Sequence, residues 1–201
     1  MKHLLQAISL LITLTTLTYC QSPSDRPLIT PMVDGHLEEY IELGVKPIDL
    51  GNEVKLYIYQ NDHYVWLAYS YPEGSYGILD MEIVSPKITD TLNIHVSAQL
   101  GEWFIKEGAP RPQNPESELW WNHRGWYSNE VWPNGSDKSG DAPRPRFKNA
   151  QAREIRLSKD RFGYGEWNFN LKLGSIRLAN GSFTSIRYPD EHVFFTLNTK
   201  M

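Results

Sequence analysis

Apolar and polar residues alternate along much of the chain, with the period of two that is typical of β-strands buried on one face. In residues 53–59, three aliphatic residues alternate with lysine and tyrosine. Asn61 and Asp62 then supply turn-forming side chains before a second apolar run at residues 64–69, so the two runs predict a β-hairpin. Similar runs predict further strands at residues 76–84, 92–99, 153–157, 167–173, 175–178 and 193–197.

Helical periodicity is almost absent, since only residues 159–165 have a pattern that suits a single turn of helix. Seven or eight short strands separated by turn residues predict an all-β fold, an antiparallel β-sandwich of the jelly-roll-like kind. Asn180-Gly181 predicts a further hairpin turn. Residues 101–148 interrupt the pattern with prolines and glycines and predict a long Trp-rich loop insertion. A loop of that length in a compact domain is usually functional or contains short strands of its own.

The first 20 residues differ from the rest and predict a signal peptide. A short polar head precedes the apolar run Leu4–Tyr19, which is shorter than the about 20 residues of a membrane-spanning helix and suits an export signal. A buried N-terminal helix is the alternative. Residues 21–31 contain three prolines and predict a tether, and residues 32–201 form the predicted β-sandwich domain.

Cys20 is the only cysteine of the chain. The sequence Leu17-Thr18-Tyr19-Cys20 resembles the end of a bacterial lipoprotein signal, in which the cysteine becomes the lipidated first residue. Leu17 and Thr18 fit that pattern, whereas Tyr19 is larger than the small residue that normally precedes the cysteine. The resemblance implies a lipid anchor at Cys20 as the only membrane contact. Ordinary signal cleavage after Cys20 is the alternative, and in both cases the domain has no internal disulfide.

Composition and charge narrow the possible functions. Hydrophobic residues make up 40% and charged residues 22% of the 201 residues, which suits one folded domain. Twenty basic and 24 acidic residues give a formal charge of −4, so we expect no nucleic-acid partner. The unusual feature is the aromatic content of 12%, which includes seven tryptophans.

Residues 33–40, with the sequence VDGHLEEY, resemble the start of family 9 carbohydrate-binding modules and related DOMON-like sandwiches. Residues 54–69, 79–83 and 154–171 resemble later strands of that family in the same order. The resemblance covers most of residues 32–178 in outline. It implies a β-sandwich and carbohydrate binding, although the same sandwich also carries haem or serves as a scaffold in other proteins. The paired tryptophans and calcium ligands of the family have no assigned counterparts in this chain.

The Trp-rich segment Glu118–Gly135 is the strongest local signal for a binding site. Aromatic rings offer apolar area to the C–H faces of sugars, while amide, imidazole and guanidinium groups bond to sugar hydroxyls. The alternative is that the tryptophans anchor the loop on the sandwich, as we expect for Trp66, Trp103 and Trp167, which lie in or beside strand patterns. The candidate ligand-binding residues of the segment are Trp120, Trp121, Asn122, His123, Arg124, Trp126, Tyr127, Asn129 and Trp132.

The polar face of residues 92–99 is the second candidate. His95, Ser97 and Gln99 alternate with apolar residues and are expected to project in a row, with His95 and Gln99 as ligand-binding residues. Asp80 and Glu82 form a similar row on a strand that could be a neighbour. Such rows on a concave face could hold a sugar or transfer protons.

A catalytic alternative is a polysaccharide lyase, which needs a base and a group that neutralises a uronate carboxylate. His95 and His123 are candidate bases, and Arg124 and Tyr127 have suitable chemistry. No pair of carboxylates stands out for glycoside hydrolysis, and no histidine or cysteine spacing suits a metal site. We therefore assign no catalytic residue and expect no cofactor, apart from the structural calcium that a sandwich can carry.

The sequence thus predicts non-catalytic polysaccharide or oligosaccharide binding by a secreted or lipid-anchored bacterial surface protein. A polysaccharide-active enzyme is the alternative. A third hypothesis is a surface module that binds a protein or a cofactor through its tryptophans.

Overall fold

The computed structural model describes residues 29–106, 112, 114–129, 132–148 and 150–200. The predicted signal peptide, the predicted lipidation site at Cys20 and most of the predicted tether therefore lie outside the described residues. Within the described part of the chain, no helix is long and apolar enough to cross a membrane.

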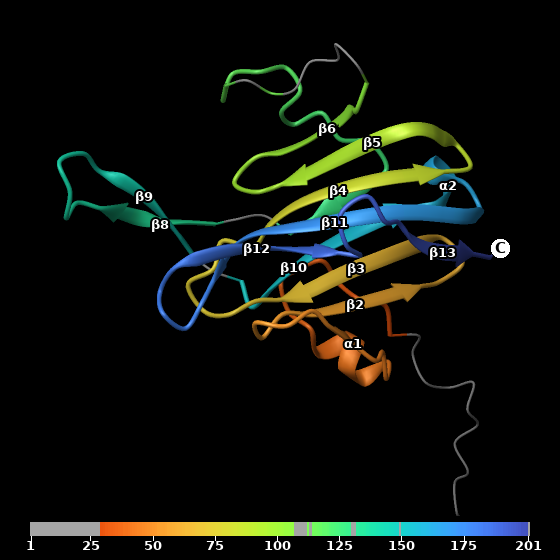
Figure 1. Cartoon of the computed structure of the whole chain (residues 1–201), viewed down its shortest axis with the longest axis horizontal. Helices are drawn as coiled ribbons and strands as arrows, with labels where there is room; N and C mark the ends of the chain where they lie inside the picture. The colour runs from red at the N-terminus through yellow and green to blue at the C-terminus, as the bar shows by residue number, and fades with distance from the viewer. Residues whose placement is uncertain (1–28, 107–111, 113, 130–131, 149, 201) are drawn as a thin grey trace, which may run out of the picture.

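The described residues form two antiparallel sheets and one separate hairpin (Figure 1). In the first sheet the strand order is β1-β2-β3-β10-β7, and the second has the order β12-β11-β4-β5-β6, with β13 also paired to β11. The strands of the first sheet are β1 (Ile48–Asp49), β2 (Lys55–Gln60), β3 (Tyr64–Ser70), β10 (Ala152–Ser158) and β7 (Trp126–Ser128). Those of the second are β12 (Phe183–Tyr188), β11 (Gly165–Arg177), β4 (Ile78–Ser85), β5 (Ile88–Val96), β6 (Leu100–Phe104) and β13 (Phe195–Thr199).

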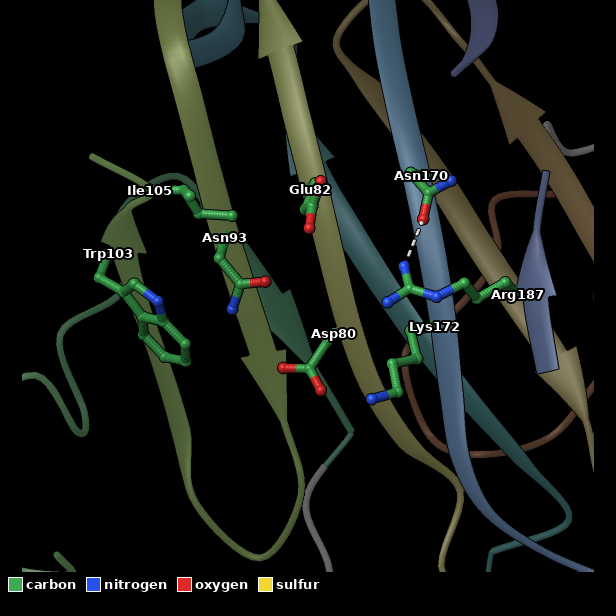
Figure 2. A pocket seen from close by; sticks show the side chains of 8 residues that line it. All are labelled: Asp80, Glu82, Asn93, Trp103, Ile105, Asn170, Lys172 and Arg187. Atoms are coloured by element: carbon green, nitrogen blue, oxygen red, sulfur yellow. Dashed lines mark hydrogen bonds between the residues drawn. The ribbon is translucent and has the colours of Figure 1, made fainter. Parts of the chain in front are cut away.

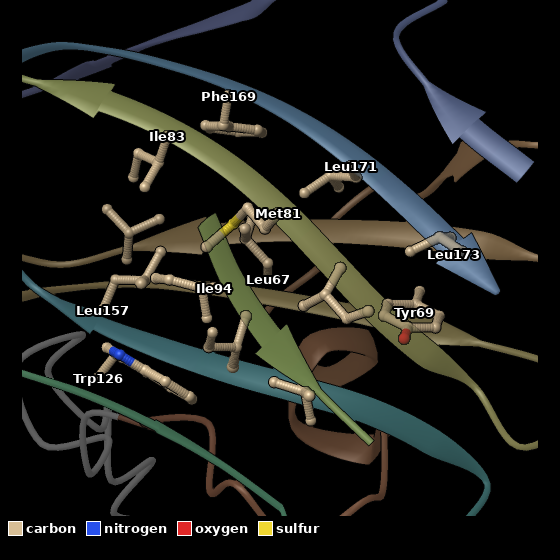
Figure 3. Packing of buried hydrophobic residues seen from close by; sticks show 14 of the residues in the cluster. Leu67, Tyr69, Met81, Ile83, Ile94, Trp126, Leu157, Phe169, Leu171 and Leu173 are labelled. Atoms are coloured by element: carbon tan, nitrogen blue, oxygen red, sulfur yellow. The ribbon is translucent and has the colours of Figure 1, made fainter. Parts of the chain in front are cut away.

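Facing sides of the two sheets supply the main hydrophobic core (Figure 3). Leu67 of β3, Met81 of β4 and Leu171 of β11 are at most 2% exposed in this core. Each alternates along its strand with residues of the opposite face, as the period of two predicts. The predicted all-β antiparallel sandwich is therefore confirmed. Trp167 is also confirmed as a core residue, with no exposed surface.

The outer face of the first sheet is covered by the short helix α1 (Glu38–Glu42), which lies beside β2 in Figure 1. Tyr40 of this helix packs in a second apolar cluster with Tyr57 and Trp66 of the sheet. Trp66 is fully buried, which confirms its predicted packing role. In the second sheet, by contrast, mostly polar side chains alternate with the core residues. Among the described residues, the second sheet therefore offers a polar outer face, whereas α1 covers part of the first sheet.

Several predicted element boundaries needed correction. Strand β5 ends at Val96, so residues 97–99 form a turn and do not continue the predicted strand. The predicted strands 167–173 and 175–178 are one strand, β11, with an irregular register between Leu173 and Ile176. The predicted helical turn is confirmed as α2 (Lys159–Phe162). Strand β12 follows the predicted turn at Asn180-Gly181 but was not itself predicted.

The predicted loop insertion contains strands of its own. Strand β7 joins the edge of the first sheet by pairing with β10. Strands β8 (Trp132–Asp137) and β9 (Arg144–Lys148) pair with each other in a hairpin that stands away from both sheets in Figure 1. The insertion is therefore partly built into the sandwich.

Candidate functional site

Strand register brings the two predicted polar rows together. Strands β4 and β5 pair so that Asp80 lies opposite His95 and Glu82 lies opposite Asn93. Their neighbours along each strand, among them Met81 and Ile94, face the core. The expectation that the strand of Asp80 and Glu82 neighbours the strand of His95 is thus confirmed. Ser97 and Gln99 of the predicted row lie instead in the turn after β5.

Residues of the flanking strands lie opposite these pairs, so that two lines of side chains cross the sheet from strand to strand. Lys172 of β11 lies opposite Asp80, and Arg187 of β12 lies opposite Lys172. In the line of side chains that contains Glu82 and Asn93, Asn170 of β11 lies opposite Glu82, and Trp103 of β6 lies opposite Asn93. Five strands therefore place cations at one side of the face, carboxylates near the middle and an indole at the other side.

These side chains line an open pocket of about 200 Å³, which we call the sheet pocket (Figure 2). Figure 2 shows Lys172 extending toward Asp80, and Trp103 at the opposite side of the pocket. Apart from Ile105 and the indole, every lining group is polar. The residues of the sheet pocket are Asp80, Glu82, Asn93, Trp103, Ile105, Asn170, Lys172 and Arg187.

Asn93 is the most informative residue of the sheet pocket. It is only 6% exposed, and its Nδ2 group is buried without a hydrogen-bond partner. A buried donor without a partner costs about 1–3 kcal/mol, and a water, ion or ligand that accepts its hydrogen bond would remove that cost. Within the described residues, the side chains of Glu82 and Lys172 also form no hydrogen bond or ion pair. Three groups of the pocket are therefore available to a ligand.

Asn170 fixes the cationic side of the pocket. It is 3% exposed, and its Nδ2 group lies 2.7 Å from the carbonyl oxygen of Val193, with two further carbonyls nearby. Its Oδ1 atom accepts a hydrogen bond of 3.2 Å from Arg187. Arg187 also lies 3.6 Å from Glu191, a surface pair that contributes little to its position. The guanidinium is thus oriented over β11, as the dashed line in Figure 2 shows.

His95 does not line the pocket itself but contacts Asp80 and Trp103, which do, and it belongs to a chain of hydrogen bonds. Its Nδ1 atom is 2.7 Å from Asp80 Oδ1, and its Nε2 atom is 2.9 Å from Ser97 Oγ. Because a carboxylate only accepts, Asp80 favours the tautomer with the proton on Nδ1 and leaves Nε2 as the acceptor. The backbone N–H of Gln99 donates to Ser97 at 3.2 Å and completes the chain.

The imidazole of His95 and the indoles of Trp103 and Trp120 form an aromatic corner. The imidazole centroid is 5.3 Å from the Trp120 ring and 6.1 Å from the Trp103 ring, and the two indoles meet edge to face at 6.0 Å. Gly101 makes this corner possible, since a Cβ atom there would lie 2.6 Å from the carbonyl oxygen of Leu119 and 3.0 Å from the Trp120 ring. Trp103, which we predicted to be a core residue, is half-buried and lines the pocket.

Two of the predicted ligand-binding residues of the Trp-rich segment lie in the interior. Trp126 is 4% exposed and belongs to the main core, so it presents no ring to a ligand. Asn129 is also 4% exposed, and its amide donates to the backbone carbonyl of Ala152 and accepts from the backbone N–H of Glu154. Trp126 begins β7 and Asn129 directly follows it, so the pairing of β7 with β10 places both side chains in the interior. Neither residue fits the predicted exposed surface, and we exclude them from the candidate site.

The remaining loop candidates lie outside the sheet pocket. Trp121 is 60% and Tyr127 is 42% exposed, and they do not line the pocket. Gln99 lies in the turn, where its amide donates to the carbonyl of Pro115 and so leaves the predicted row. The loop residues Asn122, His123 and Arg124, between Trp121 and Tyr127 in the sequence, are exposed. Trp132 begins β8, and its side chain lies outside the described residues.

Five residues of the pocket lie outside the predicted polar rows: Trp103, Ile105, Asn170, Lys172 and Arg187. Asn93 lies on the predicted polar face of residues 92–99 but was not named as a ligand-binding residue. The alternation of Asn168, Asn170 and Lys172 with apolar residues was a usable signal for the last two. Nothing in the sequence indicates that Arg187 lies beside them, because that depends on the pairing of β12.

No group of three or more histidine, cysteine, aspartate or glutamate side chains suited to hold a metal ion occurs among the described residues. A comparison of the chain with protein-family models, with curated proteins and with solved structures finds no match. The resemblance to family 9 carbohydrate-binding modules therefore stays a prediction.

Proposed function

We propose that the chain binds carbohydrate without catalysis and that the binding site is the sheet pocket. The observation that carries this proposal is the unpartnered amide of Asn93, buried in the wall of a pocket that also holds an indole and two carboxylates. A polar ligand with many hydroxyls would satisfy such a site.

Each part of the pocket matches a part of a sugar. Hydroxyl groups can donate to Asp80 and Glu82 and accept from Asn93. The Trp103 ring offers apolar area to the C–H face of the sugar, with Trp120 beside it at the aromatic corner. A concave site with a few convergent polar groups and an aromatic wall is the usual form of a small-ligand site.

The position of the pocket also suits a polymer. Neighbouring strands are about 4.8 Å apart, so the distance from β12 to β6 across four strand intervals is about 19 Å. That length exceeds one sugar ring and favours an oligosaccharide or a segment of a polysaccharide.

The test is affinity gel electrophoresis of the purified protein in gels cast with plant, algal and microbial polysaccharides. We expect retardation in at least one gel and a loss of binding of roughly tenfold or more in Trp103→Ala, because the ring supplies much of the apolar contact. Trp121→Ala is the matched control, since its indole is exposed outside the pocket.

Two outcomes would contradict the proposal. Unretarded migration in every gel would argue against carbohydrate binding. Loss of binding in Trp121→Ala but not in Trp103→Ala would place the site on the loop, at Trp121, Asn122, His123, Arg124 and Tyr127, and not in the sheet pocket.

Secretion or lipid anchoring at Cys20 is part of the same proposal. It is supported by the apolar run Leu4–Tyr19 and the cysteine that follows it. Labelling of cells with a fatty-acid analogue should mark the wild-type protein and leave Cys20→Ser unmarked. An unmarked but exported wild-type protein would favour ordinary signal cleavage.

A second function, a polysaccharide-active enzyme with His95 as base, is favoured by the hydrogen bond from His95 to Asp80. Asp80 orients the ring, and Nε2, which lies 2.9 Å from Ser97 Oγ, is the nitrogen that takes the proton in an elimination reaction on a uronate. This function predicts release of unsaturated oligosaccharide products, lost in His95→Ala while binding persists. Binding without product from any polysaccharide would leave only the non-catalytic function.

A further inference from the structure

We infer that the sheet pocket selects glycans that carry a carboxylate, that is, uronic-acid oligosaccharides, and that Lys172 and Arg187 bind the acid group. This inference rests on the proposed function and names its ligand class. It is carried by the juxtaposition of an unpaired lysine and an oriented arginine on one side of a sugar-sized pocket.

Lys172 is exposed at the pocket and forms no hydrogen bond or ion pair within the described residues, although Asp80 lies opposite it on the neighbouring strand. Figure 2 shows its ammonium group extending toward the space between β11 and β4. A lysine that lies opposite a carboxylate without pairing to it has its donors available for an incoming anion.

Arg187 supplies the second positive group, because it lies opposite Lys172 on β12. One of its terminal nitrogens donates to Asn170, and this hydrogen bond orients the guanidinium in advance. The other terminal nitrogen lies 3.6 Å from an exposed carboxylate oxygen of Glu191. Two adjacent cations on neighbouring strands can bind the two oxygens of one carboxylate, and such charge-assisted hydrogen bonds are stronger than neutral ones.

The carboxylates of the pocket set the limit on ligand charge. Asp80 and Glu82 balance Lys172 and Arg187 in formal charge, and the whole chain carries −4. A densely sulfated polymer therefore gains no attraction from the overall field and is repelled by the two carboxylates. A sugar with a single carboxylate can place that group on the β11–β12 side, away from the pocket's own carboxylates. The hydroxyls of the same sugar can then donate to Asp80 and Glu82.

The test compares matched pairs of glycans that differ only in the acid group. Polygalacturonate, alginate and glucuronoxylan are each titrated beside their carboxyl-reduced forms, with a chelator present so that calcium does not bridge carboxylates. We expect tighter binding of at least one acidic form, by roughly tenfold, because the reduced form loses the charge-assisted contacts. The preference should shrink as salt is raised, since Lys172 is exposed.

Lys172→Gln should abolish this preference while retaining binding of the reduced form. Lys55→Gln is the matched control, because Lys55 is an exposed lysine of the first sheet and its loss changes the net charge equally. Equal binding of acidic and reduced forms, or an unchanged preference in Lys172→Gln, would overturn the inference and leave carbohydrate binding intact. Tighter binding of a sulfated glycan than of every uronate would also overturn it. Absence of binding to all forms would instead contradict the proposed function.

Discussion

Trp126 and Glu102 are joined in the core by a hydrogen bond of 2.6 Å from the indole Nε1 group to the carboxylate Oε2 atom. Arg161 binds the same carboxylate with both terminal nitrogens, at 2.6 and 2.7 Å. Strand β7, which begins at Trp126, is thereby tied to strand β6 of the other sheet and to the helix α2. Figure 3 shows the Trp126 ring among the aliphatic side chains of the core.

Trp126→Ala is expected to destabilise the fold and not to act as a binding variant. Removal of a buried tryptophan typically costs about 3–5 kcal/mol, through lost burial and the cavity that remains. The measurement is the free energy of unfolding in urea. Trp121→Ala, at an exposed position, should change it by less than about 0.5 kcal/mol. A stable Trp126→Ala protein would contradict the burial of this ring.

Glu102→Gln should lower the free energy of unfolding by roughly 3 kcal/mol, because it leaves the largely buried Arg161 guanidinium without its counter-charge. The amide can still accept the indole hydrogen bond, so the loss reports mainly on the ion pair. Glu191→Gln is the control, since it breaks an exposed pair with Arg187 that should contribute less than about 1 kcal/mol. Equal losses in the two variants would show that burial does not strengthen the Glu102–Arg161 pair.

The sequence predicted the outward-facing side chains of single strands better than it predicted the site. Alternation is local, so the outward positions of Asp80, Glu82 and His95 follow from their immediate neighbours. The register between strands depends on residues far apart in the chain, and this is why Lys172 and Arg187 were not assigned to the same face.

The tryptophans show the same limit. Trp103 was predicted to lie in the core and Trp126 to lie on the loop surface, yet Trp103 lines the pocket and Trp126 lies in the core. Pairing of β7 with β10 and the hydrogen bond to Glu102 decide this difference. Neither interaction has a local pattern, so residue type alone could not separate core from surface.

Gly101→Ala is expected to disturb the aromatic corner. The added Cβ atom would meet the carbonyl oxygen of Leu119 at 2.6 Å and the Trp120 ring at 3.0 Å, so the segment around Trp120 must move. Overpacking of this kind typically costs about 1–3 kcal/mol, and we expect weaker glycan binding as well. Both are measured by urea unfolding and by titration. Gly140→Ala is the control, because no atom lies within 4 Å of its Cβ position.

Stability should fall as the pH rises from 5 to 8, because of Glu154. This carboxylate accepts hydrogen bonds from the backbone N–H groups of Asp34 and Gly35, at 2.9 and 2.6 Å, and holds the N-terminal segment against β10. Burial nevertheless raises the pKa of Glu154 to about 7, while its Oε1 atom has no partner. The folded protein thus holds this proton more tightly than the unfolded chain, where the ordinary value is 4.5.

The contribution of protonated Glu154 to the free energy of unfolding is complete below pH 4.5, where the folded and unfolded states are both protonated. It is lost as the pH rises through about 7. A difference of this size corresponds to roughly 3 kcal/mol at most, measured as the change in the free energy of unfolding between pH 5 and pH 8. Glu154→Gln resembles the protonated side chain and can still accept both backbone hydrogen bonds, so it should flatten the pH dependence. An equal decline in wild type and Glu154→Gln would show that other groups control the stability in this range.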